Sequence, residues 1–132
     1  MQVFENDIKL RGFLGKDAET PSSDHIRMDS FAVLLLVTVS GKWDISANVW
    51  IPIKTWHRIV CPGPFFCGMV RGMKQGYYLE IEGEMREQEQ EHTVVVAGKR
   101  YPAKYGTYAV HATRITRLEA PDSVLIDFGE DG

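Results

Sequence analysis

The sequence lacks an excess of charge of either sign. Its 15 lysines and arginines stand against 18 acidic residues, which gives a net charge of −3 at pH 7 with neutral histidines. Proteins that hold polyanions by total charge carry a basic surplus, and this chain has none. Any binding site for such a ligand must therefore depend on where individual charges lie.

Cysteine is scarce as well. The two cysteines, Cys61 and Cys67, do not form a disulfide framework, and we expect buried or free thiols in a reducing cytoplasm. No CxxC pair occurs and His57 is the only histidine near them, so no metal site is predicted. A phosphate-binding glycine loop and a nucleophile–base pair are also missing. We therefore predict no catalytic residue, no metal, no cofactor and no enzymatic activity.

Long apolar runs are missing too. The longest, FAVLLLVTV at 31–39, is too short to cross a bilayer, and the first residues lack a signal-peptide pattern. We expect a soluble cytoplasmic protein without a membrane partner. Its 132 residues, 44% of them hydrophobic, suit one packed domain. We assign residues 1–119 to this domain and residues 120–132 to a short acidic tail.

Most of the chain alternates apolar and polar residues as strands do. Apolar spacing around residues 65–73 indicates one short helix, and residues 94–106 are expected to extend a hairpin between the last two strands. Five strands with one helix between the third and fourth is the order of an OB-fold, so we predict an all-β, five-stranded OB-fold barrel. The expected strands lie at 6–14, 30–39, 48–61, 77–87 and 107–118.

The segment 48–61 has the most informative pattern. One face is apolar and is expected to point into the barrel, while the other alternates indoles with cations. Bases stack on indoles and cations hold phosphates, so this second face suits a single-stranded nucleic acid. Tryptophan and arginine are also enriched at subunit interfaces, and the pattern alone leaves that alternative open. The apolar face holds Val49, Ile51, Ile53, Ile59 and Cys61, and the other holds Trp50, Lys54, Trp56 and Arg58, with Trp43 and Lys42 in the preceding loop.

Three short blocks resemble the bacterial single-stranded DNA-binding proteins, the SSB family. They are NDIKLRGFLGKDAE at 6–19, TWHRIV at 55–60 followed by Gly63, and IEGEMR at 81–86. The resemblance implies an OB-fold that assembles as a homo-oligomer, a tetramer with a dimer as the alternative, and binds single-stranded DNA without sequence preference. By position it implies base stacking by Trp43 and Trp56, and basic residues near the DNA at Arg58, Lys74 and Arg86.

The hairpin of the fourth strand departs from that family. Pro62 and Gln90 stand where the family has aromatic residues, and basic positions are replaced by Gln88 and Glu89. Like charges repel, so we expect the DNA to avoid the glutamates of this hairpin and to run over Trp43, Trp56 and Arg58 instead. The glutamates concerned are Glu87, Glu89 and Glu91. A second aromatic-basic cluster near the hairpin tip contains Lys99, Arg100, Tyr101, Lys104 and Tyr105, and between a second binding cluster and a solvated hairpin tip we expect the solvated tip.

Two predictions concern partners and roles. The tail is similar in kind to the family's acidic, partner-binding tail, with a solvated terminus as the alternative. DNA replication, recombination or repair is the process that the resemblance implies. The missing aromatics and added glutamates leave a second function open, a replication-restart-like protein-interaction module of OB-fold type with weak or no affinity for DNA. The tail residues concerned are Asp127, Phe128, Glu130 and Asp131.

Overall fold

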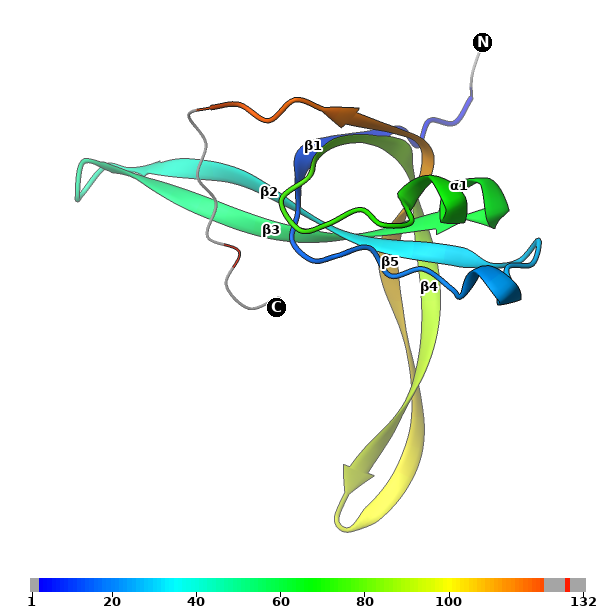
Figure 1. Cartoon of the computed structure of the whole chain (residues 1–132). Coiled ribbons are helices and arrows are strands. Elements are labelled where there is room, and N and C mark those ends of the chain that lie inside the picture. Colours follow the sequence, from blue (N-terminus) through cyan, green and yellow to red (C-terminus); the bar gives the residue numbers. More distant parts are fainter. Residues whose placement is uncertain (1–2, 123–127, 129–132) are drawn as a thin grey trace.

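A computed structural model describes residues 3–122 and residue 128, without the side chains of residues 89–94 and 101–106. Five strands close into a barrel in the order β1-β2-β3-β5-β4, with one helix between β3 and β4 (Figure 1). This arrangement confirms the predicted all-β OB-fold. The elements are β1 (Ile8–Leu14), the 3₁₀ turn η1 (Ser23–His25), β2 (Phe31–Asp44), β3 (Val49–Pro62), α1 (Gly63–Val70), β4 (Tyr78–Val96) and β5 (Lys99–Leu118).

The barrel interior is filled by aliphatic side chains from every strand. Neighbouring strands run antiparallel except β3 and β5, which pair in parallel where Ile59 meets Val110. The helix α1 packs on β2 and β3 and adds Cys67 and Val70 to the same core. The largest fully buried residues are Leu14, Leu34, Leu36, Ile59, Leu79 and Ile81.

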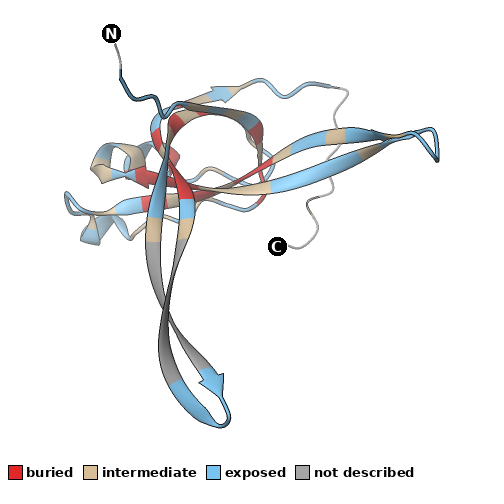
Figure 2. Ribbon diagram, turned by 180° about the vertical axis from the view of Figure 1, so that it is seen from behind, coloured by how far each residue is buried: buried red, intermediate tan, exposed pale blue. Residues whose placement is uncertain are grey.

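Two hairpins leave the barrel as separate arms. The β2–β3 arm remains paired out to Asp44 and Val49, and the β4–β5 arm out to Val96 and Lys99. In Figure 1 the cyan-to-green β2–β3 arm and the yellow β4–β5 arm point in different directions. Figure 2 shows the buried residues gathered in the barrel, whereas the described residues of the arms are mostly exposed. A two-stranded ribbon has no second layer against which to bury a face.

The arms explain where the predicted elements are wrong. The pattern places the end of the second strand at Val39, but β2 continues to Asp44, so Trp43 lies in a strand and not in a loop. The inward apolar face is also wrong for Val49 and Ile53, which are 48% and 42% exposed, because β3 enters the barrel only after them. At the barrel end of β3 the prediction is confirmed, since Ile59 and Cys61 are fully buried.

The last two predicted strands are longer than their sequence pattern indicates. β4 and β5 absorb the expected hairpin extension and form one continuous ribbon of paired residues. The helix begins at Gly63 with a proline in its first turn, and Gly72, with a left-handed φ of 82°, follows its end. Within the described part of the chain, no helix is long and apolar enough to span a membrane.

The two cysteines are free and buried, on β3 and α1. Burial raises the pKa of the Cys61 thiol to about 12, with a further contribution from nearby Cys67. Both residues belong to the hydrophobic core cluster, so they act as small apolar side chains. The described residues contain no group of three metal-ligating side chains.

Candidate nucleic-acid interface

The β2–β3 arm brings the three tryptophans of the chain to one face. Residues directly opposite in an antiparallel ladder share a face, and successive residues of a strand alternate between faces. Trp43 lies opposite Trp50, and Val37 lies opposite Trp56, so all three indoles stand on the outer side. Two cations of β3 share their parity. We call this surface the tryptophan face, and it consists of Trp43, Trp50, Lys54, Trp56 and Arg58.

The indoles of the tryptophan face differ in exposure. Trp43 and Trp50 are 54% and 59% exposed and form a cross-strand pair near the end of the arm. Trp56 is half-buried where the arm meets the barrel. Exposed indoles at the arm and a supported indole at the barrel give a line of aromatic surfaces along the arm. Trp56 is six positions after Trp50 on β3, which is about 20 Å at the rise of a β-strand.

Two glycines hold indoles of this face in place. A Cβ atom at Gly41 would overlap the ring of Trp50, and one at Gly15 would overlap the ring of Trp56. Each ring therefore rests directly against a stretch of backbone. A ring supported on one side loses little further freedom when a base stacks on its other side, which favours binding.

Each cation of the face donates a hydrogen bond to another part of the chain. Arg58 donates from Nη1 to the side-chain oxygen of Gln88 at 2.8 Å, which ties β3 to β4. Lys54 donates from Nζ to the backbone oxygen of Phe128 at 2.9 Å. Because a glutamine amide carries no net charge, the contact fixes the Arg58 guanidinium without cancelling its charge. That guanidinium is suited to bind a phosphate.

Three predicted cations are not part of the tryptophan face. Lys42 pairs with Ile51 and occupies the opposite face of the same arm. Lys74 lies between α1 and β4, 3.6 Å from a carboxylate oxygen of Asp17. Arg86, on β4, is ion-paired with a glutamate two residues before it. The fold thus brings five of the predicted site residues onto one face. Lys42 and Lys74 lie apart from that face, while Arg86 stands on β4 two residues before the Gln88 that binds Arg58.

Sequence reasoning missed Tyr108. A pocket of about 130 Å³ lies where the two arms diverge, lined by residues of β3, β4 and β5. Tyr108 lines it with Trp56 and Arg58, and is itself 65% exposed. The parallel contact between β3 and β5 creates this neighbourhood. No local pattern in the sequence signals a parallel pairing between strands so far apart.

His57 is a packing residue of the arm's base. Its Nε2 atom lies 2.8 Å from the Thr38 hydroxyl on the paired strand. Burial lowers the pKa of this imidazole, which favours the neutral ring. Its strand position alternates with those of Trp56 and Arg58, so it stands on the opposite side of β3.

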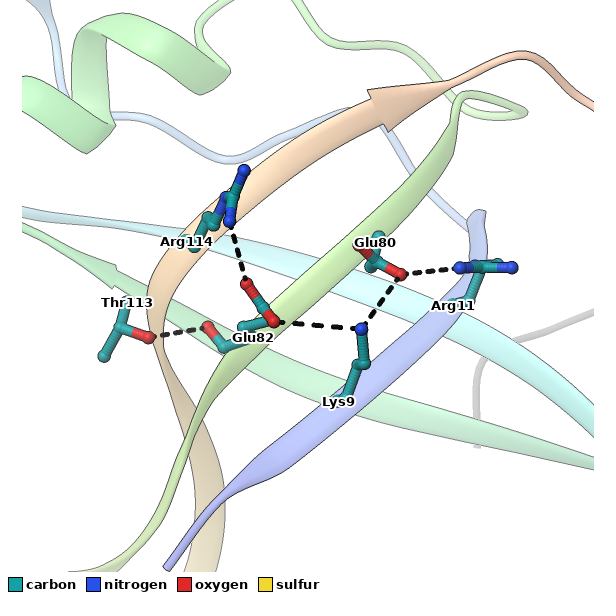
Figure 3. Close-up of polar contacts among 6 residues, drawn as sticks. All are labelled: Lys9, Arg11, Glu80, Glu82, Thr113 and Arg114. Atoms are coloured by element: carbon teal, nitrogen blue, oxygen red, sulfur yellow. Dashed lines mark hydrogen bonds and ion pairs between the residues drawn. The ribbon is translucent and has the colours of Figure 1, made fainter.

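The glutamate stripe of β4 is neutralised by the strands on either side of it (Figure 3). Arg11 donates to Glu80 at 2.7 Å, and Lys9 lies between Glu80 and Glu82 at 3.8 and 3.9 Å. Arg114 of β5 reaches Glu82 at 3.8 Å. The hydrogen bond from Arg11 holds the pKa of the Glu80 carboxyl below its usual value. Three cations thus surround two carboxylates, and this part of the stripe presents no negative surplus.

No protein-family model matches the chain, and no curated protein matches it either. Solved structures do match. An SSB of Plasmodium falciparum in complex with single-stranded DNA gives a TM-score of 0.64 at 18% identity, covering 90% of this chain and 99% of that one. The chain shares its fold with single-stranded DNA-binding proteins.

Two further structures with this fold come from bacteria. A deletion mutant of the single-stranded DNA-binding protein of Thermus aquaticus gives a TM-score of 0.63 at 19% identity, over 87% of this chain and 51% of that one. The chain thus spans about half the length of that protein. A small single-stranded DNA-binding protein of Streptomyces coelicolor gives 0.54 at 12% identity, over 87% and 96%.

Proposed function

We propose that the chain is a divergent member of the SSB family and binds single-stranded DNA without sequence preference. The observation that carries this proposal is the tryptophan face, which combines three indoles with two cations on one side of an arm. Bases would stack on the indoles at roughly 1–3 kcal/mol each, and the cations would neutralise phosphates. Binding of this kind breaks no bond and needs no catalytic group.

The local charge of the arm supports the proposal although the whole chain is acidic. Two paired segments make up this part of the arm, residues 35–43 and 50–58. The side chains that these segments place on the outer side include Lys54 and Arg58 but no acid. Phosphates responding to nearby charges would meet a positive strip there. Lys42, Lys74 and Arg86 remain proposed phosphate contacts at the margins of the path.

The fold also supports proposals about the setting of the protein. We infer a homo-oligomer, a tetramer with a dimer as the alternative, that acts in the cytoplasm during DNA replication, recombination or repair. The acidic tail would recruit protein partners. Of its predicted residues, Phe128 accepts the bond from Lys54, while Asp127, Glu130 and Asp131 lie outside the described residues.

Titration of the intrinsic tryptophan fluorescence with poly-dT near 50 mM salt, a concentration that favours binding, tests the proposal. We expect quenching as bases cover the indoles. Trp50→Ala and Trp43→Ala should each weaken binding by roughly 5- to 150-fold, the equivalent of one lost stack. Absence of quenching by poly-dT at this salt concentration would rule out the function.

A protein-interaction module with weak or no DNA affinity is the competing function. It predicts capture of one stoichiometric protein partner that survives nuclease treatment, together with no quenching. The neutral partner of Arg58 and the ion-paired Glu80 and Glu82 favour DNA binding instead. The two experiments together separate these functions.

A further inference from the structure

A second pair of aromatic rings lies on the outside of the barrel. The ring centroids of Phe13 on β1 and Tyr78 on β4 are 4.8 Å apart, with the planes inclined at 43°. Their chain neighbours Leu14 and Leu79 are fully buried. Because successive residues of a strand point to opposite faces, Phe13 and Tyr78 belong to the outer face. Neither ring contributes to the interior of the barrel.

Strand register places this ring pair in one row with Trp56. Tyr78 lies opposite Phe13, Phe13 opposite Val37, and Val37 opposite Trp56. The row therefore crosses β4, β1, β2 and β3 in order. Neighbouring strands are about 4.8 Å apart, so the row is about 14 Å long.

The indole of Trp56 leans along this row toward the ring pair. It lies against Gly15, which directly follows β1, two residues beyond Phe13, and continues the pairing with β2 by donating its N–H to the Leu35 oxygen at 2.9 Å. Residues two apart on a strand share a face, so the supported indole and the phenyl ring are neighbours on one surface. The tryptophan face and the ring pair are thus continuous.

An open pocket of about 150 Å³ adjoins the ring pair. Its apolar lining includes Phe13, Tyr78, Val37 and Val39, and Arg11, Gly12, Thr38 and Pro121 line it as well. Val39 is 52% exposed, so the apolar surface continues past the rings onto β2. A mainly apolar pocket that also has a guanidinium in its lining suits a nucleobase and the phosphate beside it.

The charges around the ring pair permit an anionic strand. Lys9, Arg11 and Arg114 surround Glu80 and Glu82, which leaves a surplus of one positive charge among these five groups (Figure 3). Glu80 and Glu82 follow Tyr78 along β4, so this slightly positive cluster is next to the ring pair. A phosphate chain crossing from Trp56 would therefore meet no net repulsion there.

We propose that Phe13 and Tyr78 form an additional base-stacking site. A DNA strand lying on Trp56 continues across β2 to these two rings, while Arg11 contacts the adjoining phosphate. This inference rests on the proposed function, because it extends the same DNA path from the arm onto the barrel. Its ligand is single-stranded DNA, and a second copy of the chain on this face is the competing occupant.

The test combines affinity with cross-linking, using an oligothymidylate of about 16 nucleotides, the upper site size for one OB-fold. Phe13→Leu and Tyr78→Leu remove the rings but keep apolar side chains, and thermal unfolding confirms that each variant folds. Each should weaken binding by roughly 5- to 100-fold. Phe4→Leu removes a phenylalanine that is 85% exposed and lies outside the row, and it should leave the affinity unchanged. With 5-iodouracil in the oligonucleotide, irradiation should cross-link a peptide that contains Phe13 or Tyr78.

The outcomes separate this inference from the proposed function. If Trp50→Ala weakens binding while both leucine variants bind normally and no cross-link reaches either ring, the additional site is refuted and the proposed function stands. If poly-dT neither binds nor quenches the unmodified protein, the proposed function fails first. If the leucine variants change the mass of the assembly at unaltered DNA affinity, the rings belong to a contact between copies and the inference is overturned.

Discussion

Gly15 supports the indole of Trp56 only because it has no side chain of its own. Its backbone conformation is not left-handed, so an alanine there meets a steric obstacle and no torsional one. The obstacle is the ring itself, together with a methyl group of Val37. This position therefore links the packing of the barrel edge to the shape of the candidate interface.

We expect Gly15→Ala to displace the Trp56 ring and to weaken binding of poly-dT. Overpacking of this kind also costs about 1–3 kcal/mol of unfolding free energy. Fluorescence titration and urea unfolding measure the two effects. In a Trp56→Leu background the same change should cost much less in both, because its main obstacle is gone. Equal costs in the two backgrounds would show that the glycine acts independently of the indole.

Two histidines should make stability depend on pH. Burial lowers the pKa of His57 and of His111, and the Nε2 atom of His111 is buried without a hydrogen-bond partner among the described residues. A folded-state pKa below the unfolded value of about 6.5 means that the unfolded chain takes up more protons. The stability from these groups is therefore complete above about pH 6.5 and is lost as the pH falls through the folded values.

Urea unfolding between about pH 8 and pH 5, a window that spans the ordinary histidine pKa, checks this dependence. The unfolding free energy should fall on acidification, and His57→Gln and His111→Gln should each make the fall shallower. His25→Gln, at an exposed position in η1, serves as the control and should leave the slope unchanged. A slope that neither of the first two variants alters would contradict the assignment.

At the scale of elements, the β2–β3 arm has two lysines on opposite faces, and their effects on binding can be compared directly. Lys54 shares the face of the tryptophans, and Lys42 does not. We expect Lys54→Ala to weaken binding of poly-dT and to lower the slope of log affinity against log salt by about 1. Lys42→Ala removes the same charge from the other face and should change both quantities less. Equal effects would mean that DNA contacts both faces of the arm.

The existence of the strands was predictable, but their ends were not. Alternation at Ile59 and Cys61 continues outward through Val49 and Ile53, although only the inner pair is buried. The alternation of apolar and polar residues indicates that a strand has two different faces. Whether the apolar face is buried depends on whether another layer of the protein covers it. The length of β2 beyond Val39 likewise depends on its pairing with β3, which contributes hydrogen bonds wherever the partner continues.

The candidate site was predictable where it lies within one strand. Trp50, Trp56 and Arg58 alternate along β3 and are visible in the sequence. Phe13, Tyr78 and Tyr108 join the surface only through pairing between distant strands. Such pairing is set by register across the sheet, which no short stretch of sequence contains.

At the scale of the whole molecule, the barrel contains the described core, and the outer part of the β4–β5 arm does not contribute to it. The described core cluster draws on β4 only up to Ile81 and on β5 only from Val110 onward. Described residues near the tip are exposed, with Val95 and Val96 at 63% and 56%. The fold should therefore not depend on the outer part of this arm.

Replacing residues 89–106 by an Asn-Gly turn tests whether the fold depends on the outer part of the arm. Gln88 and Thr107 are directly opposite in the ladder, so a two-residue turn can join them. We expect the melting temperature to change by only a few degrees and DNA affinity by less than about threefold, far below the loss of one stack. A large loss of affinity would place the aromatic-basic cluster at the tip on the DNA path, against our expectation.

Trp56 also has a structural role, because its indole covers a buried residue of the barrel. Val37 has no exposed surface although it stands on the outer side of the barrel, and the indole opposite it and Gly15 are its neighbours there. A lineage that had stopped using this surface would still keep the tryptophan, because losing it would uncover a core residue. Trp50, which is 59% exposed at the arm, is free of that constraint. Whether a homologue keeps Trp50 is therefore the better indication that it still uses this surface for binding.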